Sequence, residues 1–265
     1  MEPLIYAHRG SSAQFAEHTR AAMLQALADG ADGVECDVHL TGDRQLVCLH
    51  DPTVDRTSDG SGAVAELTEA QLRALDVSSW KGASVPAEYG TAAEQFLSLS
   101  DLLAILRGAG REIGVAIELK HPSPYGRALE DAVVALLTAQ GWDAATSRLD
   151  GVLVSFMSFD PGSVAHMADH VGPTHLCQLT DALPGALPEG VLAGPSVDAV
   201  RADPEAVRAA VAAGRRFRVW TVDDPADVRL LRDIGVQEIT TNEPALVREC
   251  VDNDVMADVN VHNLS

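Results

Sequence analysis

The regular alternation of short strand-like runs with longer helical runs is the feature of this sequence that most limits how the chain can fold. Runs rich in β-forming residues predict strands near residues 4–7, 33–40, 46–49, 113–119, 151–156, 174–179, 196–200, 216–222 and 236–241. Apolar residues recur with helical period near residues 19–28, 100–108, 127–140, 162–169, 204–213, 226–233 and 244–250. About eight such units, without a G-x-G-x-x-G motif, predict an α/β protein of the (β/α)8 TIM-barrel class rather than an open dinucleotide-binding sheet.

One stretch interrupts this alternation after the second barrel strand. Residues 52–95 hold a turn-prone segment, Asp59-Gly60-Ser61-Gly62, and a helix start at Thr68, whose hydroxyl is suited to cap the helix. We therefore expect a small insertion at about residues 52–95 within a single domain that spans residues 1–250. Residues 251–265 are polar and carry no period, which predicts a flexible tail.

The charge of the chain restricts its partners. Its formal charge is -20 at pH 7, so there is no basic surface for nucleic acid. No apolar run reaches the roughly 18 residues of a membrane span, which argues against stable membrane insertion. The N-terminus lacks a signal-peptide pattern, and cysteines 36, 48, 177 and 250 form no C-x-x-C pair. We expect a cytoplasmic protein with free thiols, and the sequence sets no oligomeric state.

Ionisable residues gather where the predicted strands end. Because the active sites of parallel barrels lie at the C-terminal ends of the strands, reactive groups are expected at this rim. Side chains two residues apart on a strand point to the same side, so the carboxylates at positions 35 and 37 face one way. The ionisable groups at strand ends are His8, Glu35, Asp37, His50, Glu118 and Lys120.

Three of these groups are carboxylates, and converging carboxylates repel each other. Unless one of them is protonated, a cation has to lie among them. Ligands that are all oxygen suit Mg2+ or Ca2+ better than Zn2+, and Mn2+ is a third candidate. We therefore predict that Glu35, Asp37 and Glu118 bind one divalent cation. The alternative is that they are solvated strand-end residues or pair with Arg and Lys.

Two histidines and two cations lie beside the predicted metal ligands. An isolated histidine is more often a surface or structural residue, but His8 and His50 both end strands next to the acidic cluster, and histidine suits proton transfer near neutral pH. Arg9 and Lys120 could hold an anion or neutralise a carboxylate. Trp220 is either a core residue or a platform that faces the substrate. Together these groups fit phosphoryl chemistry, in which negative charge grows at the transition state.

In their order along the chain, these residues resemble the glycerophosphodiester phosphodiesterase family. The N-terminal half matches at His8-Arg9-Gly10, Glu17-His18-Thr19, Glu35-Cys36-Asp37-Val38, His50-Asp51-Pro52, Asp55-Arg56-Thr57, Gly60-Ser61-Gly62, Leu67-Thr68-Glu69-Ala70-Gln71-Leu72 and Glu118-Leu119-Lys120. The rest matches at Ser155-Phe156, Val219-Trp220-Thr221-Val222 and Ile239-Thr240-Thr241-Asn242-Glu243-Pro244. The resemblance covers residues 4–248, and the ordered set is specific although no single motif is.

The resemblance implies a fold and a reaction. The fold would be a (β/α)8 barrel with residues 52–95 as its insertion. The reaction would convert a small-molecule glycerophosphodiester to glycerol 3-phosphate and an alcohol, with His8 and His50 as the acid–base pair. The implied route is attack by the substrate's own 2-hydroxyl group, which gives a cyclic phosphate that water then opens. This route needs no Ser or Cys nucleophile.

The resemblance also assigns ligands. One divalent cation, usually Ca2+ or Mg2+, would be bound by Glu35, Asp37 and Glu118. The phosphate would be contacted by Arg9 and Lys120, and the glycerol or phosphate pocket would be lined by Trp220.

Two residues depart from the family pattern. The family usually has Asn where this chain has His18, and often has Asn where this chain has Asp223. His18 could replace Asn as a hydrogen-bond donor, or it could add a third titrating group near the site. A carboxylate at position 223 would repel an anionic substrate if it faced the site, and it could instead face solvent beside Asp224.

Other functions share parts of this pattern. A phospholipase D-like barrel that acts on lysolipids or sphingolipids would carry similar groups, but neither exposed apolar loops nor a basic membrane-facing surface is evident. A barrel that only binds anionic ligands would be expected to lack a ligand or a histidine, and all are present. A metal-dependent amidohydrolase needs an H-x-H pair on the first strand, where this chain has His8-Arg9-Gly10.

Overall fold

The computed structural model describes residues 2–252 and alternates strands with helices along the chain. The parallel strands are β1 (Leu4–His8), β2 (Gly33–Leu40), β4 (Ile113–Leu119), β6 (Val152–Ser158), β7 (Leu176–Thr180), β8 (Leu192–Pro195), β9 (Arg218–Val219) and β10 (Glu238–Thr241). The α-helices are α1 (Arg20–Ala28), α2 (Glu69–Arg73), α3 (Leu99–Arg107), α4 (Ala128–Ala139), α5 (Pro161–Met167), α6 (Val197–Ala202), α7 (Pro204–Ala212) and α8 (Pro225–Ile234), and residues 244–252 are also helical.

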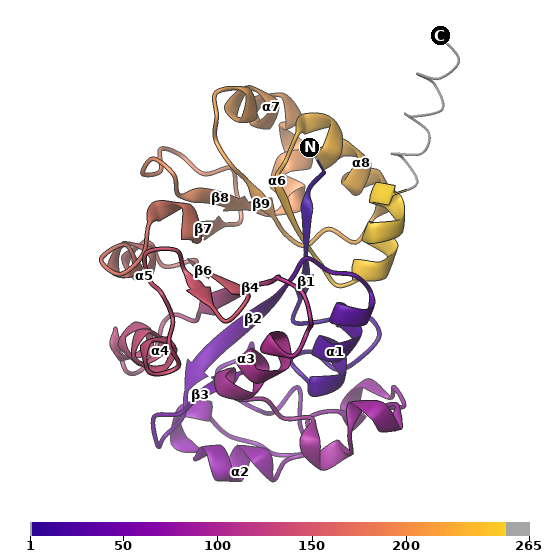
Figure 1. Ribbon diagram of the computed structural model, residues 1–265, viewed down its shortest axis with the longest axis vertical. Coiled ribbons are helices and arrows are strands. Elements are labelled where there is room, and N and C mark those ends of the chain that lie inside the picture. The colour runs from indigo at the N-terminus through magenta and orange to yellow at the C-terminus, as the bar shows by residue number, and fades with distance from the viewer. Residues whose placement is uncertain (1, 253–265) are drawn as a thin grey trace.

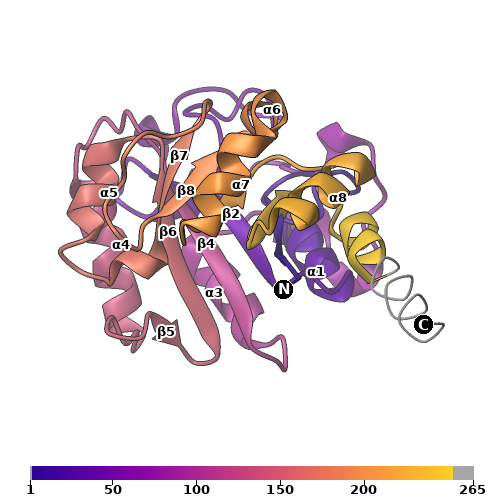
Figure 2. The ribbon, with the colours of Figure 1, turned by 90° about the horizontal axis from the view of Figure 1, so that it is seen from above.

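The parallel strands form a barrel, as the sequence predicts. Within the described residues they follow the order β8-β7-β6-β4-β2-β1-β10-β9. Parallel bridges between Ala193 and Phe217 and between Ser196 and Trp220 join β8 to β9, the two ends of this series. The short strands β3 (Leu46–Cys48) and β5 (Arg148–Leu149) add antiparallel to β2 and β6. Helices lie around the outside of the strands in Figure 1 and Figure 2.

The strand predicted at residues 196–200 is wrong, because these residues begin helix α6 and the barrel strand β8 precedes them. The Ser196 hydroxyl accepts a hydrogen bond from the Ala199 N–H, which caps the helix. The buried residues Val197 and Val200 are three apart, the spacing of one helix face. β8 itself carries little strand signal, because Gly194 leaves no room for a side chain: a Cβ there would lie 2.8 Å from the Cys177 sulfur.

Two other predictions at the C-terminal end need correction. The strand expected at residues 216–222 is only two residues long, β9. Residues 251 and 252, predicted to belong to a flexible tail, are helical, and Val251 is buried. The rest of that predicted tail, residues 253–265, lies outside the described residues. Among residues 2–252, no helix is both long and apolar enough to cross a membrane.

The insertion packs against β3 and holds the loop that follows it. Its helix α2 begins after Thr68, whose hydroxyl accepts from the Gln71 N–H while the Gln71 side chain accepts from the Thr68 N–H. Four short 3-10 segments accompany α2 in this stretch: Val64–Glu66, Ser79–Lys81, Ala87–Tyr89 and Ala92–Glu94. Its apolar side chains form a small core with Val47 and Leu49, just before His50. In Figure 1 it lies below β3 and α1.

A buried ion pair lies at the opposite end of the barrel, where the strands begin. Arg218 opens β9 and Glu238 opens β10, and they are only 2% and 4% exposed. The Arg218 Nε donates to Glu238 Oε2 at 2.7 Å, and the guanidinium lies 4.4 Å from the centre of the Tyr6 ring. Removing one partner would leave the other as an uncompensated buried charge.

We therefore expect Glu238→Gln to lower the free energy of unfolding by about 3 kcal/mol, because Arg218 would stay charged in the barrel interior. Urea denaturation followed by circular dichroism measures this. The matched control is Glu205→Gln on α7, where the side chain is 78% exposed and the change should stay within about 0.5 kcal/mol. Equal effects of the two substitutions would contradict this account of the barrel interior.

Candidate active site

Two neighbouring strands bring the predicted metal ligands together. Glu35 and Asp37 lie on β2, and Glu118 lies on β4 directly opposite Asp37 in the parallel register. All three carboxylates are buried, and each offers an oxygen within 4.8 Å of the other two. On the other side of β2, His8 at the end of β1 is in register with Glu35. The side chains that the sequence places at strand ends therefore meet at one rim.

Too little positive charge lies near the three carboxylates for all of them to be ionised. Burial, together with the charges of Asp37 and Glu118, raises the pKa of Glu35 well above its usual range. Burial and the Asp37 charge likewise raise the pKa of Glu118 to about 8. Burial also opposes ionisation of Asp37, but the hydrogen bond from His18 and the charge of Lys120 hold its pKa well below its usual range. Asp37 is thus the anionic centre of the cluster.

The two cations at this rim pair with carboxylates. The Lys120 ammonium lies 2.8 Å from Asp37 Oδ1 and 2.7 Å from Glu118 Oε1. The Arg9 guanidinium lies 2.8 Å from Glu17 Oε1 and 3.2 Å from Asp37 Oδ2. Neutralisation of carboxylates, which the sequence left as an alternative, is therefore what these two side chains do in this structure. Contact with a phosphate stays a prediction for both.

The residues at the cluster fit a divalent cation. If all five carboxylates of the connected network were ionised, its three permanent cations would leave two formal negative charges, which is the charge that one divalent cation balances. The network consists of Glu17, Glu35, Asp37, Asp51, Glu118, Arg9, Arg56 and Lys120. Within the described residues, the buried Oε1 atom of Glu35 has no hydrogen-bond partner. An all-oxygen set with an unpartnered buried oxygen and excess negative charge suits Mg2+ or Ca2+.

His8 is held with a defined ring orientation. Its Nδ1 lies 2.8 Å from the Asn242 side-chain oxygen, and because an amide oxygen only accepts, the Nδ1–H must be the donor. The other ring nitrogen, Nε2, faces the cluster at 4.0 Å from Glu35 Oε2. Burial, and the charge of Arg9, lower the pKa of His8 to about 4. The ring is therefore neutral near pH 7 and has a free lone pair on Nε2.

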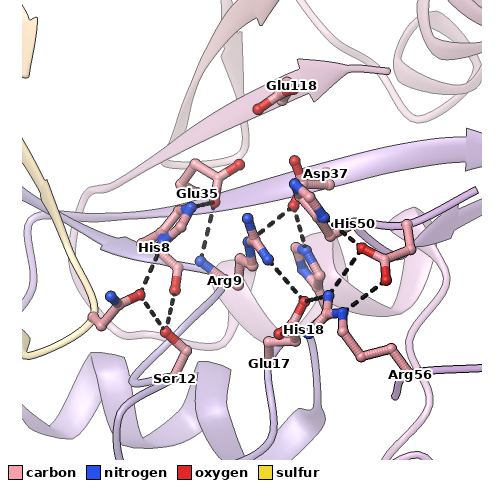
Figure 3. A network of polar contacts seen from close by, with 12 residues as sticks. His8, Arg9, Ser12, Glu17, His18, Glu35, Asp37, His50, Arg56 and Glu118 are labelled. Atoms are coloured by element: carbon pink, nitrogen blue, oxygen red, sulfur yellow. Dashed lines mark hydrogen bonds and ion pairs between the residues drawn. The ribbon is translucent and has the colours of Figure 1, made fainter. Parts of the chain in front are cut away.

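His50 is held by a carboxylate instead of an amide. Its Nδ1–H donates to Asp51 Oδ1 at 2.7 Å. Asp51 is in turn fixed by Arg56, which donates to both of its oxygens and also reaches Glu17. The neighbouring residue Leu49 donates its N–H to the Asp37 carbonyl, which ties this loop to β2. In Figure 3, His8 lies beside Glu35, and Arg9 lies between His8 and His50.

The two residues that depart from the family pattern both make specific contacts. The buried His18 donates from Nε2 to Asp37 Oδ2 at 2.8 Å, so it acts as a hydrogen-bond donor to a predicted metal ligand. The carboxylate of Asp223 is turned toward Asn242, which donates a hydrogen bond to each of its two oxygens. Neither alternative given for Asp223 from the sequence describes this contact.

Trp220 lies next to β9 and is partly buried. Its indole N–H donates to the Gly194 carbonyl at 2.8 Å, and its ring packs on the apolar cluster inside the barrel. The exposed ring of Phe159, which follows β6, stands edge-on to it with 5.4 Å between centroids. Trp220 is thus a packed, partly buried residue. Its contact with a substrate stays a prediction.

Sequence reasoning gave no role to several residues that hold this site. Asn242 directly follows β10, so the same strand-end argument that found His8 could have singled it out. Glu17 and Arg56 lie in irregular loops, and neither spacing nor periodicity indicates that they would meet at 2.8 Å. Their contacts depend on how the loops pack in the folded protein.

The fold and the site together define a class of protein. A parallel barrel with a buried oxygen-ligand cluster and two histidines at the C-terminal ends of its strands is built like a hydrolytic TIM-barrel enzyme. The chain belongs to the glycerophosphoryl diester phosphodiesterase family, whose model matches residues 8–246. It is accordingly a phosphoric diester hydrolase.

Relatives and solved structures agree with this family. The chain is 39% identical over 249 residues to the probable glycerophosphodiester phosphodiesterase 1 of Mycobacterium tuberculosis, covering 91% of this chain and 90% of the relative. It is 30% identical over 247 residues to the glycerophosphodiester phosphodiesterase of Caldanaerobacter subterraneus, covering 92% and 96%. An Oleispira antarctica phosphodiesterase in complex with the product sn-glycerol-3-phosphate superposes with a TM-score of 0.79 at 27% identity, covering 95% and 97%.

Proposed function

We propose that this enzyme hydrolyses small-molecule glycerophosphodiesters to glycerol 3-phosphate and an alcohol, with His8 and His50 as its acid–base pair and one divalent cation at Glu35, Asp37 and Glu118. The observation that carries the proposal is the arrangement of the two imidazoles. Each ring gives its Nδ1–H to a fixed acceptor, which leaves its Nε2 for proton transfer. His8 Nε2 lies 4.0 Å from the Glu35 carboxylate, and the loop that carries His50 is tied to β2 at Asp37.

The different acceptors suggest which histidine begins as the base. His8 faces the uncharged Asn242 amide and is buried, so it favours the neutral form and can accept the proton of the substrate's 2-hydroxyl on Nε2. His50 faces the Asp51 carboxylate, so a protonated ring there is ion-paired. It can donate its Nε2 proton to the leaving alcohol oxygen as the bond from phosphorus to that oxygen breaks.

The second half of the reaction reverses these roles. A water that attacks the cyclic phosphate loses its proton to His50, which is now neutral. The 2-oxygen leaves phosphorus and regains a proton from His8. When bound, the divalent cation would act as a Lewis acid that stabilises the negative charge growing on the phosphoryl oxygens.

Two fixed cations are available to hold the phosphate. The Lys120 ammonium neutralises Asp37 and Glu118 in this structure, and it is left for an anionic substrate once the cation neutralises those carboxylates. Arg9 lies between the two histidines in Figure 3 and presents a planar guanidinium suited to phosphate oxygens. We assign Trp220 to the wall of the glycerol pocket. The product complex of the Oleispira antarctica relative supports a glycerol phosphate as the ligand class.

The remaining proposals concern the chain as a whole. We propose that residues 1–250 act as one catalytic domain. The acidic surface fits a protein that works in the cytoplasm without nucleic-acid partners.

Removal of divalent cations should abolish turnover. We expect chelation by EDTA to lower hydrolysis of glycerophosphocholine by at least about 100-fold, and Mg2+, Ca2+ or Mn2+ to restore it. Asp37→Asn should weaken cation binding by at least about tenfold in calorimetry, whereas Asp150→Asn at an exposed position should not. Turnover that persists in EDTA would exclude metal dependence. Faster turnover of a lysolipid than of glycerophosphocholine would favour the phospholipase-like alternative.

The two histidines should differ in their response to the leaving group. We expect His8→Ala and His50→Ala each to lower kcat on glycerophosphocholine by about 10²–10⁴-fold. A nitrophenol leaving group needs no acid. With such a substrate, kcat of His50→Ala should be much closer to that of the wild type, whereas kcat of His8→Ala should stay low. His175→Ala, away from the rim, is the control. Tight binding of glycerol 3-phosphate by the wild type without any turnover would instead indicate a binding protein.

A further inference from the structure

We propose that Asp223 is a positioning residue that fixes, through Asn242, which ring nitrogen of His8 carries the proton. The inference rests on the proposed role of His8 as a base, and it extends the site to a residue that touches neither His8 nor the cluster. Three residues at adjacent strand ends form the relay: His8 after β1, Asn242 after β10 and Asp223 beyond β9.

The contacts of Asp223 leave the Asn242 amide a single orientation. Asp223 Oδ1 accepts the Asn242 backbone N–H at 2.7 Å and the Thr241 hydroxyl at 2.9 Å. Its Oδ2 lies 2.6 Å from the Asn242 side-chain nitrogen. An ionised carboxylate has only acceptors, so the NH2 group of Asn242, and not its oxygen, must face Asp223. The amide oxygen then points toward His8 and Ser12.

This orientation decides the state of the neutral imidazole. The Asn242 oxygen accepts from His8 Nδ1 at 2.8 Å, so the proton is held on Nδ1 and the lone pair is on Nε2, which faces the cluster. If the amide turned over, its NH2 would face Nδ1, and the ring proton would move to Nε2. His8 could then accept no proton from a substrate hydroxyl. The Ser12 hydroxyl, 2.8 Å from the same oxygen, can donate or accept and so does not fix the amide by itself.

An asparagine at position 223 would keep its oxygen toward the Asn242 backbone N–H and the Thr241 hydroxyl, so its NH2 group would face the Asn242 side chain and favour the reversed amide. In this chain, one member of the pair is a carboxylate, and that removes the unproductive arrangement. The Asp223 carboxylate accepts its hydrogen bonds from Asn242 and Thr241 and is not directed at the substrate. In this proposal, the departure from the family pattern at Asp223 sets the orientation of the Asn242 amide.

The test compares three proteins with labelled histidine in the presence of Mg2+. Nitrogen-15 NMR reports which ring nitrogen of His8 is protonated, and steady-state kinetics report kcat and KM. We expect the wild type to hold the Nδ1–H form. Asp223→Asn should shift His8 toward the Nε2–H form and lower kcat by at least about tenfold, with KM nearly unchanged, because most of the population then has the wrong tautomer.

The exchange of the two residues should restore the tautomer. In Asp223→Asn/Asn242→Asp, a carboxylate faces His8 and an amide donor faces that carboxylate, so the Nδ1–H form should return. A carboxylate beside His8 also favours its protonated form, so the tautomer measured at high pH, and not kcat, is the readout for this variant. Asp224→Asn removes the neighbouring exposed charge and keeps a good helix cap, so neither readout should change.

These readouts separate the relay from a merely structural role and from the proposed function. An Asp223→Asn protein that keeps the wild-type His8 tautomer would overturn the proposal, even if it were less stable or less active. A wild-type His8 protonated on Nε2 would overturn it as well. If the tautomer behaves as expected while His8→Ala retains full activity, the relay stands and the assignment of His8 as a base fails.

A second and independent cluster lies on the outer surface, where α4 meets α5. We infer that it binds a transition-metal ion of the Zn2+ or Ni2+ class. Asp131 comes from α4, His166 from α5 and His170 from the turn that follows it. Each of the three offers a ligand atom within 4.8 Å of the other two.

The geometry and ligand types of this cluster differ from those of the carboxylate site. The His166 Nε2 lies 2.9 Å from Asp131 Oδ1, and the two imidazole rings are 5.6 Å apart between centroids. Two imidazoles with one carboxylate suit Zn2+, Ni2+ or Cu2+ and not Mg2+ or Ca2+. Three protein ligands at an accessible surface leave a fourth position for water, which is the composition of an open zinc site.

Titration calorimetry with Zn2+ tests this site in protein that already holds excess Mg2+. The wild type should bind one Zn2+ that His170→Ala binds at least about tenfold more weakly, whereas His175→Ala should match the wild type. His170 is exposed, so its replacement is not expected to disturb folding. Identical Zn2+ binding by the wild type and His170→Ala would overturn the inference, whatever the result at the carboxylate site.

Discussion

The structure of the active site depends on one electrostatic constraint, the convergence of three buried carboxylates on two adjacent strands. Parallel pairing of β2 with β4 places Asp37 opposite Glu118, and the strand alternation turns Glu35 to the same side. Such a cluster is stable only if positive charge surrounds it. Arg9 and Lys120 supply part of that charge directly. Ionisation of all three carboxylates would need further positive charge, and a divalent cation would supply it.

Most of the fold and the convergence of the three carboxylates follow from strand periodicity. A parallel barrel collects residues from strand ends, so positions far apart in sequence can be assigned to one rim without knowing any contact. This argument succeeds for His8, Glu35, Asp37 and Glu118 because each lies on, or ends, a well-patterned strand. It fails at residues 192–202 for two reasons. Strand β8 contains the tightly packed Gly194, which gives no β-forming signal. Helix α6 begins at Val197, within a run whose composition resembles a strand.

The partners of the loop residues could not be predicted in the same way. Glu17, His18 and Arg56 lie in irregular segments, where no periodicity relates a position to a direction. Arg9 and His18 both have positive φ angles near 59°, a backbone conformation that sequence patterns rarely indicate for these residue types. The turn between them brings Glu17 to Arg9 and His18 to Asp37. These contacts depend on how the loops pack over the strand ends.

The two histidines differ in the contacts behind their rings. Both rings present Nε2 and both donate Nδ1–H, so their sequence motifs and orientation alone would make them equivalent. Their acceptors differ: Asn242 is uncharged, whereas Asp51 is an anion held by Arg56. A neutral acceptor in a buried position favours a neutral ring, and an anionic acceptor tolerates a protonated one. The two rings therefore differ in their acceptors, an amide oxygen for His8 and a carboxylate oxygen for His50, although both rings are held in the same way through Nδ1.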